Sequence, residues 1–156
     1  MIDLLERFKE QQRDLKSTLP ESQLIFLHYR SIDNFLYHFN EIKSELVKRK
    51  ILEYLEKYFV EIKEKDYFFD NTESNYISQK YIKNIGTYYN YDLNFKVYIP
   101  IKRAIFIGLN IDIILFLTGL LKKVYYLPIC TIFFTIYFLY LLLFYGKQKK
   151  LYGFKY

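Results

Sequence analysis

Residues 104–145 read AIFIGLNIDIILFLTGLLKKVYYLPICTIFFTIYFLYLLLFY, two long apolar runs separated by two lysines. The first run, 104–121, has 18 residues and the second, 124–145, has 22. A helix of this length rises about 27 Å or more, close to the thickness of the hydrocarbon core of a bilayer. Because the Lys122-Lys123 link is short, the two helices must be antiparallel. The stretch therefore predicts a two-helix transmembrane hairpin.

An alternative is that both runs are core helices of a soluble protein. The second run argues against this alternative, because it carries no charge over its length and is apolar on every face. A helix in a soluble domain normally keeps one polar face for water. We therefore expect the lipid bilayer to be the main partner of residues 104–145.

Basic residues lie mainly outside the two runs, on the sides of the chain termini. Two lysines lie between the runs, and seven Lys or Arg residues flank them: Lys96, Lys102, Arg103, Lys147, Lys149, Lys150 and Lys155. Since Lys and Arg are retained on the cytoplasmic side of a membrane, both termini are expected in the cytoplasm, with the hairpin in the inner membrane. Interface anchors are expected at Lys102, Arg103, Tyr126, Tyr145, Lys147, Lys149 and Lys150.

The net charge of +6 belongs to the membrane half of the chain. Residues 1–66 hold 12 basic and 13 acidic side chains, whereas residues 67–156 hold 11 basic and 4 acidic ones. A nucleic-acid-binding domain needs a basic patch on a folded surface, and residues 1–66 lack an excess of positive charge. Nucleic acid is therefore not expected as a partner.

Residues 1–66 show the periodicity of amphipathic helices. Between residues 25 and 46 the apolar positions recur in steps of three and four, which places them on one stripe of a helix. A break near Asn40 or a bend near Lys48 would fold the helices into a small bundle. We expect a coiled-coil-like cytoplasmic head that forms a homo-oligomer or binds a protein partner through residues 19–62.

Residues 67–103 are expected to form a short connector and a juxtamembrane segment. They are rich in turn formers, and residues 93–99 alternate apolar and polar side chains before Pro100, as in a strand. The predicted fold class is thus an all-α membrane protein with a helical head at 1–66, a connector with a possible strand, a hairpin at 104–145 and a basic aromatic cytoplasmic tail at 146–156. The tail is interpreted as a further interface anchor, and the alternative is a docking peptide for a partner.

Polar residues within the apolar runs are the candidate functional positions. Asp112 stands in the middle of the first run, where a carboxylate in lipid is costly unless it is sheltered. Gly108 and Gly119 share its helical face and are expected to allow close helix packing. The intramembrane polar candidates are Asn110, Asp112, Thr131, Thr135 and Tyr137.

Two interpretations of Asp112 remain open. In the first, a protonated Asp112 is hydrogen-bonded to the second helix, at Thr131, Thr135 or Tyr137, or to a neighbouring copy, and holds the helices together. In the second, Asp112 and Asn110 line a wet path through an oligomer. Asn110 projects about 200° around the helix from Asp112, so it could face a second subunit.

The sequence offers no motif for catalysis, cofactor binding or a metal site. Cys130 is the only cysteine, and no phosphate-cradling glycine loop or nucleophile triad is recognisable. We therefore expect no enzyme activity and no cofactor. The function indicated is a membrane-anchored adaptor that self-associates or binds a partner. The alternative is an oligomeric pore-forming or channel-like effector, with the head as sensor and Asp112 and Asn110 in or near the conduit.

Overall fold

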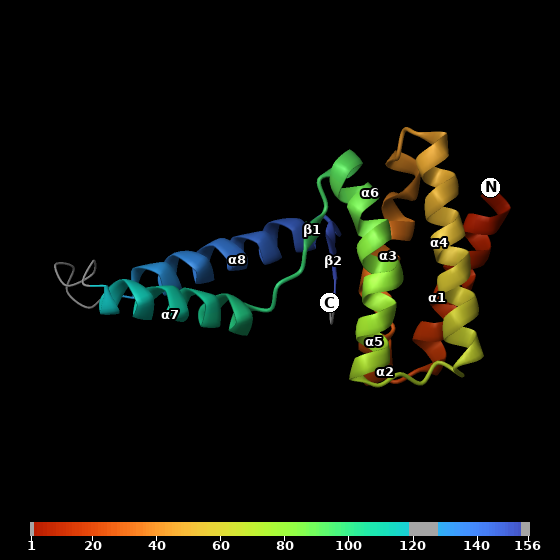
Figure 1. Ribbon diagram of the computed structural model, residues 1–156. Coiled ribbons are helices and arrows are strands. Elements are labelled where there is room, and N and C mark those ends of the chain that lie inside the picture. The colour runs from red at the N-terminus through yellow and green to blue at the C-terminus, as the bar shows by residue number, and fades with distance from the viewer. Residues whose placement is uncertain (1, 119–127, 154–156) are drawn as a thin grey trace. The chain divides into compact units, whose positions relative to one another are not determined.

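The computed structural model describes residues 2–118 and 128–153, which divide into two compact units (Figure 1). The head domain comprises the chain up to Tyr98 together with the C-terminal segment from Lys149. The helical hairpin comprises Ile99–Gln148. Both units are helical, and the sheet in the described residues has two strands of two residues each. The chain is therefore an all-α protein with minimal sheet.

The hairpin consists of α7 (Ile101–Leu117) and α8 (Ile129–Lys147), which pack side by side (Figure 1). Each helix begins directly after a proline, Pro100 or Pro128. Proline lacks the N–H that a helix interior requires but is accepted at a helix start. These prolines explain why α7 starts before the predicted 104–121 run and α8 starts later than residue 124.

Among the described residues, α8 is the one helix long and apolar enough to cross a membrane, with a mean hydropathy of 2.0. None of that apolar stretch is buried within the protein. The 17 residues of α7 rise about 26 Å, at the lower limit of a span.

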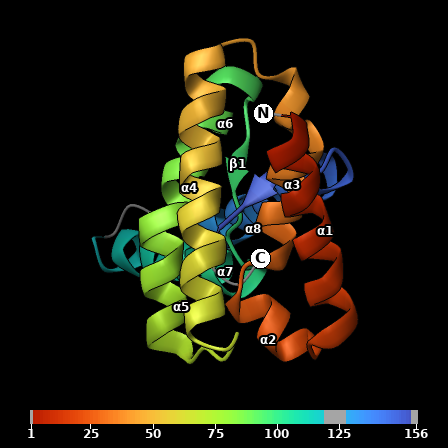
Figure 2. The same ribbon diagram turned by 90° about the vertical axis from the view of Figure 1, so that its right-hand side faces the viewer.

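The head domain is a four-helix bundle with an added strand pair. Its helices are α1 (Ile2–Thr18), α3 (Tyr29–His38), α4 (Glu45–Glu64) and α6 (Lys83–Leu93). Contacts join α1 to α3, α3 to α6, α6 to α4 and α4 to α1, which closes the ring of helices. In Figure 2, α1 and α4 lie nearest the viewer. The core includes the stacked rings of Phe8 and Phe59, 5.1 Å apart.

The apolar stripe predicted for self-association lies mainly in the core of the bundle. His28, Ile32, Phe35, Phe39 and Ile42 are buried, and only the ends of the stripe, Ile25 and Leu46, are exposed. The stripe does not lie on one continuous helix. It is divided between α2 (Glu21–Phe26), a left-handed turn at His28, α3 and the 3-10 helix η1 (Phe39–Glu41). The expected break near Asn40 is present. Most of the side chains predicted to form a coiled-coil contact between chains therefore pack within one chain.

The segment expected to be a connector is largely helical and belongs to the head domain. It forms α5 (Asn71–Ile77), the π-helix η2 (Ser78–Ile82) and α6. Asp70 and Glu73 form a capping box that starts α5. Tyr81 and Tyr89 of this segment are buried in the core. Residues 71–93 of the expected connector are thus helical and contribute side chains to the core of the head domain.

The strand expected before Pro100 is present as β1 (Lys96–Val97) and pairs in parallel with β2 (Leu151–Tyr152). Lys96 pairs with Leu151 and Val97 with Tyr152. The backbone N–H of Lys96 donates to the carbonyl of Lys150 at 2.9 Å, and that of Tyr98 to the carbonyl of Tyr152 at 2.7 Å. The chain segments on either side of the hairpin are therefore hydrogen-bonded to each other.

Candidate functional site

Asp112 caps the start of α8. Its Oδ1 accepts the backbone N–H of Cys130 at 2.9 Å. Its Oδ2 accepts the backbone N–H of Thr131 at 2.8 Å and the hydroxyl of Thr131 at 2.6 Å. The first N–H groups of a helix have no partner within the helix and normally receive a side chain from the preceding residue. Pro128 cannot provide one, so Asp112 of the neighbouring helix does.

This capping accounts for a carboxylate within an apolar run. Both carboxyl oxygens act as acceptors, which is the bonding pattern of an ionised carboxylate. The N-terminus of α8 carries the positive end of the helix dipole, which favours a negative charge there. Of the candidate donors, Thr131 contacts Asp112, while the hydroxyl of Thr135 donates to the carbonyl of Thr131 at 2.7 Å.

Gly108, one helical turn before Asp112, allows α7 and α8 to approach closely. A Cβ at position 108 would lie 2.5 Å from Cα of Thr131 and 3.1 Å from the carbonyl oxygen of Cys130. Only a residue without a side chain leaves room for this backbone contact. Gly108 and Asp112 thus bring the first turn of α8 against α7. Gly119 and Tyr126, also named from the sequence, lie outside the described residues.

Asp112 lies closer to one end of the helix pair than the sequence suggested. It is five residues before Leu117, the end of α7, and faces the first turn of α8. The sequence predicted a position in the middle of the first apolar run. The difference follows from the later start of α8 after Pro128. The side chain of Tyr137 on α8 is 47% exposed and takes no part in the three hydrogen bonds of Asp112.

Asn110 points away from this contact. Its Nδ2 donates to the carbonyl of Phe106 in its own helix at 2.7 Å, and its side chain is exposed. Asn110 and Asp112 therefore lie on different faces of α7, as their spacing requires. The structure brings together Gly108, Asp112 and Thr131 and leaves Asn110 apart.

The basic residues named as interface anchors divide between the two units. Lys102, Arg103 and Lys147 are exposed at the ends of α7 and α8 that adjoin Pro100 and Gln148. Tyr145 lies in the last turn of α8. These four residues occupy the same end of the helical hairpin.

The C-terminal tail is part of the head domain, which differs from its interpretation as a membrane anchor. Leu151 and Tyr152 are 2% and 5% exposed. Asn34 donates from Nδ2 to the carbonyl of Leu151 at 2.7 Å. Nζ of Lys149 lies 3.8 Å from Oδ2 of Asp33 and 4.4 Å from the ring centroid of Tyr37. The main chain of Lys150 is engaged by β1, so Lys149 and Lys150 act within the head domain.

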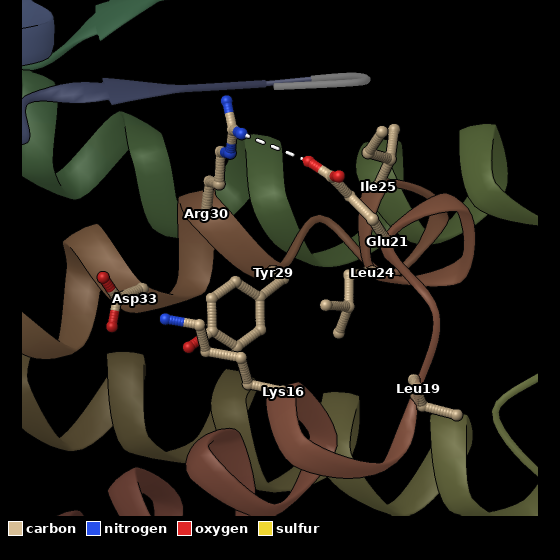
Figure 3. A pocket seen from close by; sticks show the side chains of 8 residues that line it. All are labelled: Lys16, Leu19, Glu21, Leu24, Ile25, Tyr29, Arg30 and Asp33. Carbon is tan, nitrogen blue, oxygen red and sulfur yellow. Dashed lines mark ion pairs between the residues drawn. The ribbon is translucent and has the colours of Figure 1, made fainter.

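A surface groove of about 510 Å³ lies between the end of α1, α2 and the start of α3 (Figure 3). Leu19, Leu24, Ile25 and Tyr29 supply apolar and aromatic lining. The charged lining residues are Lys16, Glu21, Arg30 and Asp33. Figure 3 shows Arg30 directed toward Glu21, with a separation of 3.6 Å. The lining thus combines apolar and aromatic side chains with two basic and two acidic ones.

His28 and Ser74 are adjacent but are not arranged for catalysis. Nε2 of His28 lies 3.2 Å from Oγ of Ser74 and 2.9 Å from its carbonyl oxygen. Both residues are fully buried, and the Ser74 hydroxyl donates to the carbonyl of Phe26 at 2.7 Å. A nucleophile must be reachable by its substrate. This pair joins α5 to the turn before α3 and has a structural role.

Burial lowers the pKa of His28, although its hydrogen bonds to the backbone of Ser74 and Gly153 act in the opposite direction. Burial also raises the pKa of Tyr58, whose hydroxyl donates to the carbonyl of Leu27 at 2.5 Å. These groups are neutral parts of the core near neutral pH. They stabilise the left-handed turn at His28.

In the described part of the chain, no three His, Cys, Asp or Glu side chains are grouped so that they could hold a metal ion. The sequence did not indicate the hydrogen bond from Asn34 to the carbonyl of Leu151 or the contact of Gly86 with the ring of Tyr152. The alternation of apolar residues in the tail is the one sequence signal that could have indicated these contacts.

No protein family, curated protein or solved structure shows significant similarity to this chain.

Proposed function

We propose that this protein is a membrane-anchored interaction module without enzyme activity. In this proposal α7 and α8 cross the inner membrane as a hairpin, with both chain termini in the cytoplasm. The head domain is held at the membrane surface, where it binds a protein partner or a second copy. The hairpin is the anchor and the head domain carries the recognition surface.

The capping of α8 by Asp112 is the observation that carries this proposal. A polar residue that lines a conduit must present its polar atoms to water or to the passing ion. Both oxygens of Asp112 instead accept hydrogen bonds from Cys130 and Thr131 of the same hairpin. These bonds shelter the carboxylate from lipid and favour a structural anchor over a pore.

The pairing of β1 with β2 supports a hairpin whose two ends emerge on one side. Lys96 before α7 and Lys150 after α8 are joined by a backbone hydrogen bond of 2.9 Å. If α7 starts at this junction, α8 ends at it and each helix crosses the bilayer, the two helices must cross in opposite directions. The excess of Lys and Arg beside these ends favours the cytoplasm for that side.

The groove between α1, α2 and α3 supports a role in recognition. Its apolar lining includes Ile25, which remains 37% exposed, and its charged lining consists of two basic and two acidic side chains. Interfaces commonly combine a desolvated apolar centre with a charged rim that selects the partner. Substitution of Ile25 by Asp should weaken partner binding without disturbing the core.

Membrane extraction and tag accessibility test the anchor. Inner-membrane vesicles that contain the protein are divided into two samples: one is washed with alkaline carbonate, and the other is kept sealed and probed with protease against a tag at either terminus. We expect the protein to stay in the pellet and both tags to be accessible only from the cytoplasmic face. Release by carbonate, or a tag reached only from the outer face, would overturn the proposal.

Recordings in planar bilayers decide between an anchor and a pore. The purified wild type and the Asp112→Asn variant are compared at equal protein density, with Thr118→Ala as a matched control in the same hairpin. The anchor predicts no discrete currents from any of the three. Discrete currents that Asp112→Asn alters and Thr118→Ala leaves unchanged would replace the anchor with the pore-forming alternative.

A further inference from the structure

One face of α7 is exposed and apolar, apart from a single amide near its centre. Phe106, Leu109, Ile113, Ile114 and Leu117 are between 46% and 75% exposed. Asn110 lies among them and is itself exposed. These six residues, here called the Asn110 face, follow the spacing of one side of a helix. The opposite side of α7, which includes Gly108 and Asp112, packs on α8.

The amide of Asn110 is only partly satisfied by its own helix. One N–H of Nδ2 donates to the carbonyl of Phe106 at 2.7 Å. In the described part of the chain, no partner is found for its Oδ1 or its second N–H. In water such groups bond to solvent, whereas in hydrocarbon they have no alternative partner and their exposure is unfavourable.

Both ends of α7 are distant from this amide. Asn110 is nine residues after Ile101 and seven before Leu117, about 13 Å and about 10 Å along the helix axis. An asparagine side chain cannot extend over such distances, unlike lysine or arginine. Lipid tails offer neither donors nor acceptors. The missing partner must therefore come from protein.

We infer that the Asn110 face is the contact between two copies of this chain within the membrane. An amide is both donor and acceptor, so two Asn110 side chains related by a two-fold axis can bond reciprocally, N–H of one to Oδ1 of the other. The flanking residues Phe106, Ile113 and Leu117 would pack against their equivalents. The inference rests on the proposed membrane anchor and adds its partner, a second copy.

This contact would organise the interaction module as a dimer. Polar side chains within apolar helices commonly join neighbouring helices through hydrogen bonds. Because Asp112 is already engaged within the hairpin, Asn110 is the polar side chain within the apolar part of α7, residues 104–117, that remains for an intermolecular contact. The two head domains would then be held at a high local concentration at the membrane surface.

Disulfide crosslinking in native membranes tests whether the Asn110 face is the contact between two copies. The single cysteine is first removed as Cys130→Ser, which retains the backbone N–H that Asp112 accepts. Ile113→Cys then marks the Asn110 face, and Tyr140→Cys marks an exposed position on α8 as a matched control. After mild oxidation, we expect a dimer band for Ile113→Cys that is several times stronger than that for Tyr140→Cys.

The role of the amide is tested in the Ile113→Cys background. Asn110→Leu should reduce the crosslinked fraction at limiting protein density by about three- to thirtyfold, the range expected for one hydrogen bond between membrane helices. Asn110→Gln keeps the amide and should restore crosslinking. Carbonate extraction of each variant is measured in parallel.

The outcomes separate the two proposals. Recovery of the wild type in the soluble fraction overturns the membrane anchor and this inference with it. Membrane-bound protein that crosslinks equally at both cysteines overturns the inference alone. The same holds if Asn110→Leu crosslinks as strongly as wild type, because another contact would then hold the copies together.

Discussion

The ring of Tyr152 occupies the space in which a Cβ of residue 86 would lie, so that Gly86 of α6 and Tyr152 of β2 are in direct contact. The same ring lies 5.7 Å from that of Phe35 on α3. A residue near the C-terminus is thus packed between two helices of the head domain. This contact fastens the segment after the hairpin to the segment before it.

Gly86→Ala tests that contact. The added methyl would overlap the Tyr152 ring, so the ring must move away from the core. We expect a loss of stability of the head domain of about 1–3 kcal/mol, measured by thermal unfolding of the detergent-solubilised protein with circular dichroism. The double variant with Tyr152→Leu should lose less than the sum of the two single losses, because both act on one contact. Additive losses would contradict this explanation.

Asn34→Ala should release the tail. The carbonyl of Leu151 would lose the 2.7 Å bond from Asn34 in a buried site, which costs about 1–3 kcal/mol. Hydrogen exchange at the amides of Lys96 and Tyr98, which bond to the tail, should accelerate. Asn84→Ala removes a comparable side-chain bond to Lys80 at the surface and serves as the control. Equal exchange in the two variants would show that Asn34 does not hold β2.

Asp112→Ala should loosen the first turn of α8. It removes all three bonds to Cys130 and Thr131, and loss of a helix cap costs about 0.5–2 kcal/mol. Thr131→Val removes only the hydroxyl bond and should have a smaller effect. The measurement is hydrogen exchange at the amides of Cys130 and Thr131 in detergent micelles. Unchanged protection in Asp112→Ala would mean that another group caps α8.

The stability of the head domain should fall as the pH decreases below about 6.5. Burial keeps the pKa of His28 below that ordinary value, so the unfolded chain binds a proton more readily than the folded chain. The unfolding free energy is therefore largest above pH 6.5 and decreases as the pH falls toward the pKa of the folded state. Urea unfolding at about pH 8 and about pH 5 measures the difference.

His28→Asn is the control for this dependence. Asparagine tolerates the left-handed backbone of position 28, where φ is 55°, but does not titrate in this range. The part of the pH dependence due to His28 should disappear in the variant. If wild type and variant lose the same stability between the two pH values, a different group is responsible.

The sequence alone determined the helices of the hairpin and the all-α character of the chain. The length and composition of 104–121 and 124–145 indicate two apolar helices, although α7 and α8 start after Pro100 and Pro128 and not at the predicted residues. These features depend on residues within a few positions of one another. The break near Asn40 is similarly local.

Only the tertiary structure decided which distant residues meet. Asn34 and Leu151 are 117 positions apart, and Asp112 and Thr131 are 19 apart. The tail and the supposed connector therefore proved to be parts of the head domain. No local pattern encodes such contacts, because they depend on packing that forms only after the helices are assembled. The sequence shows which residues are apolar, polar or charged. Which residue each of them contacts is decided by the tertiary structure.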